Sequence, residues 1–161
     1  MRAHFFPVRK STVTRHVANV SIALAVVGGL AGIRAQQPAA PPSAGAARSV
    51  WDGVYTDNQA KRGALKSGLC TQCHGDNFEG GPAPQLGGED FMARWSGRTV
   101  GDLFDIIRLT MPDDDPGSLP REQYADLVAY ILAVNRLPIG NTEIGTQTAP
   151  LKLIRIDASK P

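Results

Sequence analysis

Residues 75–88 restrict the fold more than any other stretch of the chain, because their 14 positions hold five glycines and two prolines. Glycine and proline interrupt helices and strands, so this stretch predicts a loop. The chain as a whole, with 161 residues, is only 6% aromatic and contains 17 glycines and 12 prolines. A long ordered loop in a chain with so little material for a core has to pack against something large.

The pattern before and after this loop indicates helices. Asp57 can cap a helix through residues 59–66, which brings the chain to Cys70. A short helical turn is expected around residues 91–95, where Phe91 and Trp95 are the large apolar side chains.

Two longer helices are expected in the C-terminal half. Thr99 and Asp102 are spaced as a capping box, which predicts a helix that runs to Thr110. Pro120 suits the first turn of a second helix that extends to about Asn135. The apolar residues with helical spacing are Val100, Leu103, Phe104 and Ile107 in the first helix and Tyr124, Leu127, Val128, Ile131 and Leu132 in the second. No segment before 151–156 alternates like a strand, so the sequence predicts an all-α fold.

The residues that carry chemistry are Cys70-Thr71-Gln72-Cys73-His74. The pattern C-x-x-C-H in an exported protein is typical of the attachment of a c-type haem. Two thiols one helical turn apart can each form a thioether with one haem vinyl group, and the following imidazole can then face the iron. A haem would also be the large group against which the loop packs.

Other uses of the cysteine pair are less well supported. A structural zinc site needs four ligands, but His4 and His16 lie in the N-terminal segment and there is no second cysteine pair. A thioredoxin-like dithiol needs strands around it, and the sequence predicts none there. A local disulfide remains an alternative, although it leaves the adjacent His74 unexplained.

The N-terminus has the pattern of an export signal. Residues 1–35 carry five basic side chains and no acidic one, and residues 17–33 are uncharged. A basic stretch, an apolar centre and small residues at the end predict a secretory signal peptide, cut after Ala35. The alternative is an uncleaved anchor, since about 17 residues is the lower limit for a membrane-spanning helix. In both cases the folded part is expected to lie outside the cytoplasm.

Composition divides the rest of the chain into three parts. Residues 36–49 are rich in proline and alanine and predict a flexible linker. The folded domain is expected at residues 50–138, followed by an extended tail at residues 139–161 that wraps the surface. Trp51 is expected to anchor the start of the domain against the haem or the last helix.

Beyond residue 35 the chain carries 12 basic and 15 acidic side chains, a net charge of −3. This balance argues against a nucleic-acid-binding protein. The acidic residues include the run Asp113-Asp114-Asp115. It is interpreted either as a solvated turn before Pro116 or as a negative patch that steers a basic redox partner.

Met111 is the predicted second axial ligand of the haem iron. It ends a helix, precedes Pro112 and stands 37 residues after His74, enough chain to reach the opposite face of the haem. Met92 is interpreted as apolar filling. Ligation by histidine and methionine leaves no open position for oxygen or peroxide, so an electron carrier is predicted rather than an enzyme. The alternative is a peroxidase-like haem enzyme in which Met111 does not bind the iron.

Residues 50–138 resemble the class I cytochromes c. The resemblance rests on CTQCH, on Pro84-Gln85-Leu86 in the glycine-rich loop, on Thr110-Met111-Pro112 and on the last helix. The chain is most similar to a small periplasmic subgroup with the patterns W-x-G-V-Y-T and F-x-x-x-W-x-G-x-T, here residues 51–56 and 91–99. Members or fused relatives of that subgroup occur with PQQ-dependent dehydrogenases, which hand electrons to a cytochrome.

The resemblance implies roles for further residues. The Pro84 carbonyl would accept a hydrogen bond from His74, and Leu86, Trp95 and Leu103 would pack against the haem. Gly63 would lie where the first helix closely crosses the last one, near Tyr130. One departure is Lys66, which stands where the family commonly has an aromatic residue; Leu65 or Leu69 would take its place. Arg94 and Arg98 are either partners of the haem propionates or surface residues.

These observations predict an all-α class I cytochrome c fold, with three to five helices and long loops around one haem c attached through Cys70 and Cys73. The predicted function is one-electron transfer in the periplasm, with His74 and Met111 as metal ligands. The expected partners are redox proteins, with a PQQ-dependent dehydrogenase as a possible donor and a cytochrome oxidase as a possible acceptor. The alternative is a membrane-tethered, electron-accepting subunit of such a dehydrogenase.

Overall fold

The structure is a computed structural model that describes residues 47–161. The expected export segment, residues 1–35, and most of the linker lie outside the described residues. No helix within residues 47–161 is long and apolar enough to cross a membrane. The elements in chain order are β1 (Arg48–Ser49), the 3-10 helix η1 (Val50–Asp52), α1 (Asp57–Lys66), α2 (Gly68–His74), α3 (Glu89–Trp95), α4 (Val100–Thr110), α5 (Arg121–Val134), α6 (Thr148–Leu151) and β2 (Ile154–Arg155).

The predicted all-α class is confirmed, because helices dominate and the strands β1 and β2 form only a short parallel pair. The expected number of three to five helices was too low, since the described part has six α-helices. Two of the six are short. The sequence CTQCH forms a helix of its own, α2, and the C-terminal segment contributes α6.

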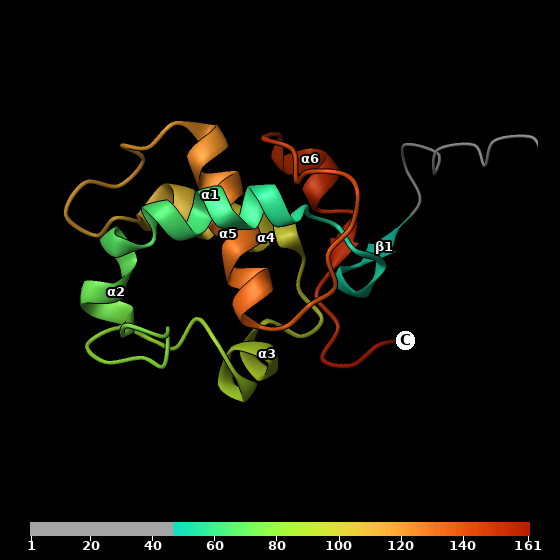
Figure 1. The fold of residues 1–161 in the computed structure, drawn as a ribbon, viewed down its shortest axis with the longest axis horizontal. Helices are drawn as coiled ribbons and strands as arrows, with labels where there is room; N and C mark the ends of the chain where they lie inside the picture. Colours follow the sequence, from blue (N-terminus) through green and yellow to red (C-terminus); the bar gives the residue numbers. More distant parts are fainter. Residues whose placement is uncertain (1–46) are drawn as a thin grey trace, which may run out of the picture. The chain divides into compact units, whose positions relative to one another are not determined.

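Helices α1 and α5 cross at the centre of the fold, where Figure 1 shows α5 passing behind α1. Gly63 makes this close crossing possible. A Cβ atom at Gly63 would lie 2.0 Å from the carbonyl oxygen of Asp126 and 2.8 Å from the Cβ of Tyr130. The close approach near Tyr130 that the resemblance implied is therefore present.

Helix α4 begins and packs as its sequence predicts. The side chain of Thr99 accepts a hydrogen bond from the backbone of Asp102, and the Asp102 carboxylate accepts one from the backbone of Thr99. The predicted apolar faces of α4 and α5 are both buried in the core. These two helices and α1 therefore form a framework whose interior consists of the protein's own side chains.

Helix α1 is capped by Thr56 rather than by Asp57. The Thr56 hydroxyl accepts the backbone N–H of Gln59 at 3.1 Å, while Asp57 is the first helical residue and pairs with Lys61. Thr56 has extended backbone angles, which an N-cap residue needs. Asp57 instead lies in the first turn, where an acidic side chain interacts favourably with the helix dipole.

Residues 139–161 are more structured than the expected extended tail. They include α6 and β2, and the apolar side chains that they bury are Ile144, Leu151, Ile154 and Ile156. Strand β2 pairs with β1, and Trp51 donates its indole N–H to the carbonyl oxygen of Asp157 at 2.9 Å. Trp51 thus anchors the start of the domain to the C-terminal segment. The sequence had led us to expect packing of Trp51 against the last helix or the haem.

Candidate haem-binding site

Helix α2 places the two thiols and the imidazole of CTQCH within five residues. Cys70 and Cys73 are one helical turn apart and both are free thiols. Cys73 is exposed, whereas Cys70 is partly buried, and this burial raises the pKa of its thiol. His74 is the last residue of α2 and is only 7% exposed. The spacing is the one that two thioether bonds to a single flat group require.

The glycine-rich loop fixes the orientation of the His74 side chain. Its Nδ1 lies 2.6 Å from the carbonyl oxygen of Pro84. A carbonyl oxygen can only accept, so Nδ1 is the nitrogen that carries the proton, and Nε2 keeps a lone pair for a metal. The loop folds back on α2 through backbone hydrogen bonds from Gly80 to His74 and from Ala83 to Cys73. The contact of Pro84 with His74 was predicted and is present.

Met111 lies at the end of α4 and is held by α5. Its carbonyl oxygen accepts a hydrogen bond from the Tyr124 hydroxyl at 2.8 Å, and that hydroxyl also accepts the backbone N–H of Leu119 at 3.3 Å. Tyr124 is 1% exposed. One buried side chain therefore closes the loop of residues 111–119 at both ends and leaves the half-buried Met111 side chain at the edge of the core.

Asn135 has the corresponding role for the glycine-rich loop. Its Nδ2 donates to the carbonyl oxygen of Leu86 at 2.9 Å, and its Oδ1 accepts the backbone N–H of Gly88 at 3.0 Å. Sequence reasoning did not single out Tyr124 or Asn135 for such roles. The sequence did contain a signal for these roles. Tyr124 places a hydroxyl on the otherwise aliphatic inner face of α5, and Asn135 places an amide directly after that helix.

The other predicted site residues differ in how much of their surface the protein covers. Trp95 and Leu103 are enclosed in the core, while Leu86 is half-buried against it. Arg98 stacks on Trp95, with its guanidinium carbon 4.5 Å from the ring centroid. Arg94 is exposed. No hydrogen bond among residues 47–161 joins His74 to Met111, although α2 and the loop after α4 lie at the same end of the fold in Figure 1.

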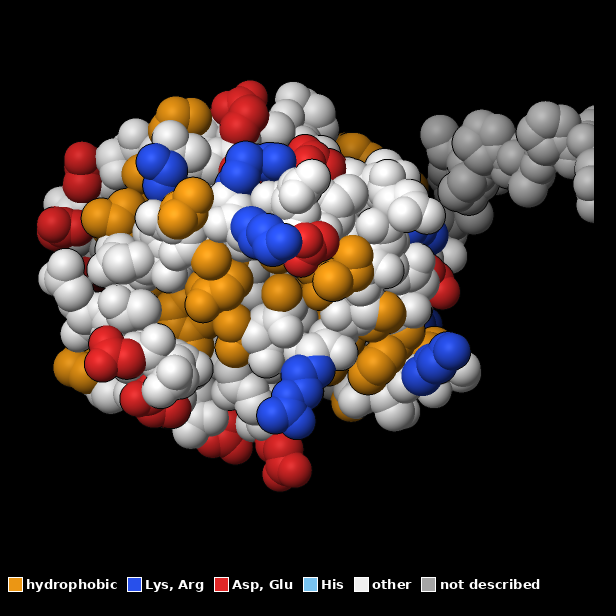
Figure 2. Space-filling view, in the orientation of Figure 1, with side chains coloured by type: hydrophobic (Ala, Val, Ile, Leu, Met, Phe, Trp, Pro, Cys, Tyr) orange, Lys and Arg blue, Asp and Glu red, His pale blue; other side chains and the backbone are white. Residues whose placement is uncertain are grey.

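Several large apolar side chains on the helices that lead to these residues are exposed. Of the six large hydrophobic side chains that are exposed in the described residues, four lie on α1, α2 and α4: Leu65 (85%), Leu69 (51%), Ile106 (42%) and Leu109 (59%). Figure 2 shows hydrophobic side chains gathered near the middle of the face that is turned to the viewer. Two thiols, an imidazole with a free Nε2 and a thioether side chain are the residues that a haem c requires.

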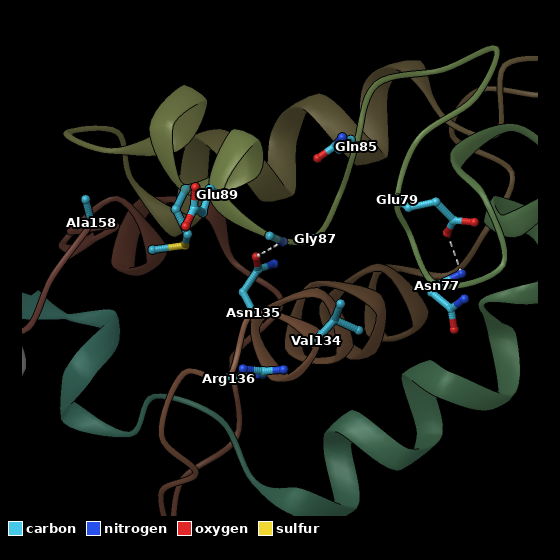
Figure 3. A pocket seen from close by; sticks show the side chains of 11 residues that line it. Asn77, Glu79, Gln85, Gly87, Glu89, Val134, Asn135, Arg136 and Ala158 are labelled. Atoms are coloured by element: carbon cyan, nitrogen blue, oxygen red, sulfur yellow. Dashed lines mark hydrogen bonds between the residues drawn. The ribbon is translucent and has the colours of Figure 1, made fainter.

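A hollow of about 620 Å³ lies between the loop and the C-terminal end of α5 (Figure 3). Its charged lining residues are Glu79, Glu89 and Arg136, and neither cysteine, nor His74, nor Met111 lines it. This hollow is therefore not the space for a haem held by the residues described above.

Residues 58–131 match the family model described as cytochrome c oxidase, cbb3-type, subunit III. The matched residues run from α1 through most of α5 and include CTQCH and Met111. The match indicates a c-type cytochrome. A cytochrome c domain implies haem as the cofactor, electron transfer as the general function and other redox proteins as partners. No curated protein and no solved structure matches the chain significantly.

Proposed function

We propose that this c-type cytochrome is an exported one-electron carrier with a single haem c, attached through Cys70 and Cys73. The observation that carries the proposal is the environment of His74. Its imidazole is buried, follows two free thiols on the same helix and donates Nδ1–H to the Pro84 carbonyl. Bound haem would supply a centre that gains and loses one electron.

The side chains of the chain have distinct roles in this proposal. Cys70 and Cys73 hold the cofactor by thioether bonds, and His74 provides the first axial ligand. Its hydrogen bond to Pro84 prevents the ring from turning and makes Nε2 a better donor. Met111 provides the second axial ligand, which raises the reduction potential. Since protein side chains then occupy both axial positions, the carrier is not an enzyme.

Packing residues protect the cofactor from water. Leu86, Trp95 and Leu103 are proposed to contact it, as the class I resemblance implies. Tyr124 and Asn135 hold the two loops that carry Met111 and the His74 partner. Because both residues belong to or directly follow α5, one rigid helix sets the spacing of the two ligand loops.

Replacement of the two methionines tests the axial ligand. In the haem-loaded Met111→Ala variant, the long-wavelength methionine–iron charge-transfer band of the ferric protein should disappear and the iron should become high-spin. Met92→Ala is the matched control, because Met92 is also half-buried against the core but is not a proposed ligand. It should leave both features unchanged. A wild-type ferric protein that already lacks the band and is high-spin would instead favour a haem enzyme with an open sixth position.

A second candidate function is an electron-accepting subunit tethered to the membrane. The observation that favours it is that the matched family takes its description from a subunit of an oxidase. A free periplasmic carrier should have a mature N-terminus after Ala35, as a signal peptide predicts. Intact mass of the protein from a native host decides between them, because retention of residues 1–35 supports the tether. A PQQ-dependent dehydrogenase as donor and a cytochrome oxidase as acceptor fit both candidates.

A further inference from the structure

Leu65 and Leu69 are two exposed leucines that precede the first attachment cysteine, and we call them the Leu65–Leu69 patch. Leu65 lies near the end of α1 and is 85% exposed, and Leu69 directly precedes Cys70 on α2 and is 51% exposed. Isolated leucines on a surface need no explanation. Leu69 adjoins Cys70, the first attachment point, so a redox partner that approaches the cofactor on this side would contact it.

Charge is segregated around this patch. Residues 67–93 and 109–120, which we call the ligand-bearing segments, contain seven acidic side chains and no lysine or arginine. The remaining described residues contain eight acidic and 12 basic side chains. The ligand-bearing segments thus have a net charge of −7, and the rest of residues 47–161 has a net charge of +4. The basic residues that border the first segment are Lys66 and Arg94.

The acidic side chains of the two regions also differ in their partners. In the ligand-bearing segments all seven are exposed and none forms an ion pair within the described part of the chain; they are Asp76, Glu79, Glu89, Asp90, Asp113, Asp114 and Asp115. Elsewhere six of the eight acidic side chains are paired with lysine or arginine, namely Asp57, Asp102, Asp105, Asp126, Glu143 and Asp157. Paired charges largely cancel at a distance, whereas unpaired exposed charges produce a field that extends into the solvent.

The figures place these charges around one end of the fold. Figure 1 shows α2, the loop that follows it and the loop of residues 111–119 at the left of the view. In Figure 2 acidic side chains lie over both loops at the upper left and lower left, with hydrophobic side chains between them.

We propose that the Leu65–Leu69 patch is the docking surface for a redox protein with a lysine- and arginine-rich face. This inference rests on the proposed electron-carrier function. Opposite charges steer such a partner to this end of the molecule, and the apolar patch supplies the short-range contact. A second copy of the chain is disfavoured as the occupant, because it would bring an equally acidic face to the same surface.

The docking surface is tested by nuclear magnetic resonance on the ¹⁵N-labelled, haem-loaded protein. The probe is a mitochondrial-type cytochrome c with a lysine-rich face, added at low and at high salt. At low salt, amide shifts should change in residues 65–80 and 111–119 and remain constant around Lys152 and Arg155. At high salt the changes should become much smaller, because salt screens charges separated by more than about 10 Å.

Matched variants distinguish the effect of charges within the ligand-bearing segments from the effect of the protein's net charge. Asp113→Asn with Asp114→Asn should weaken binding of the probe about fivefold. The control, Asp57→Asn with Glu122→Gln, changes the net charge equally but lies outside the ligand-bearing segments and should have little effect. Lys66→Gln removes the basic residue next to Leu65 and should strengthen binding.

Three results would overturn the docking proposal: equal effects of the two double variants, shifts that map to another face, or self-association of the protein through this patch. Failure of the electron-carrier function is distinguishable. In that case the haem-loaded protein could not be reduced and reoxidised reversibly, whatever the probe binds.

Discussion

Two regions of the protein are stabilised in different ways. The first is the framework of α1, α4, α5 and the C-terminal segment, which polar contacts as well as apolar packing hold together. The Gln59 amide exchanges two hydrogen bonds with the backbone of Ile144, at 2.9 and 2.8 Å. Arg62 forms ion pairs with both Asp126 and Glu143. This region has an interior made of its own side chains.

The second region consists of the ligand loops, residues 75–88 and 111–119. Polar contacts from Tyr124 and Asn135 hold the ends of these loops. Phe78 is the one fully buried side chain within the loop segments, and it packs the first loop on Tyr130 with ring centroids 5.5 Å apart. We therefore expect the framework to hold its shape without haem and the loops to depend more strongly on it.

Removal of the attachment thiols should have the largest effect, and the effect should differ between the loops and the framework. Cys70→Ser combined with Cys73→Ser prevents covalent attachment, so the haem mass should be absent from the denatured protein. Amide hydrogen exchange in the two ligand loops should accelerate about a hundredfold or more, because local stability there depends on the haem. Exchange in α1 and α5 should accelerate far less.

Gln72→Ser is the control for this experiment, since it lies on the same helix and leaves both thiols in place. Its haem content and its exchange rates should match those of the wild type. If the cysteine variants instead exchanged equally fast throughout residues 47–161, the framework would depend on the haem as much as the loops do.

The framework could be predicted from sequence to a large extent because its signals are local. Thr99 and Asp102 are three residues apart, and the apolar positions of α4 and α5 repeat with the helical period. Both patterns act within a few turns of chain. The prediction of Asp57 as the cap was wrong, because the neighbouring Thr56 can also cap a helix and the backbone angles decide between them.

Long-range contacts were not predictable from such patterns. The C-terminal segment buries Leu151 and Ile156, and Lys152 lies so close to Gly101 on α4 that a Cβ there would be 2.7 Å from its backbone nitrogen. A short apolar run gives no information about a partner 50 residues away. For the site, the spacing within CTQCH predicted how the two thiols and the imidazole lie relative to one another. The helical period does not reveal which polar groups Tyr124 and Asn135 bind. The ligand and packing roles of Met111, Leu86, Trp95 and Leu103 stay predictions.

A substitution at the helix crossing should destabilise the framework without changing the haem ligands. Gly63→Ala places a Cβ 2.0 Å from the Asp126 carbonyl oxygen, so α1 and α5 would have to separate. We expect the free energy of unfolding to fall by about 3 kcal/mol. Denaturant unfolding measures this change, and the ferric spectrum of the folded fraction should remain that of the wild type.

Gly68→Ala is the matched control, on the helix that carries the cysteines. A Cβ at Gly68 meets no heavy atom within 4 Å, and alanine favours a helix over glycine. The free energy of unfolding of this variant should rise by about 0.5 kcal/mol. If the free energy of unfolding fell equally in the two variants, the α1–α5 crossing would not be the tight contact of the framework.

The smallest expected effect concerns the acid stability of the framework. The hydrogen bond from Thr99 lowers the pKa of Asp102, and this effect outweighs burial, which acts in the opposite direction. The pKa in the folded protein thus lies below the ordinary value of 3.8. The stabilisation is therefore fully present above about pH 4 and is lost as the pH falls through the folded-state pKa.

Asp102→Asn should accordingly lower the free energy of unfolding by about 1 kcal/mol at pH 7. The difference from the wild type should shrink below pH 4, because the wild-type carboxylate becomes protonated there. Asp113→Asn is the control, since its carboxylate forms no hydrogen bond among the described residues and belongs to a ligand loop. Denaturant unfolding from pH 7 to pH 3 measures both variants. A difference that stayed constant with pH would mean that the cap acts through its shape and not through the charge of Asp102.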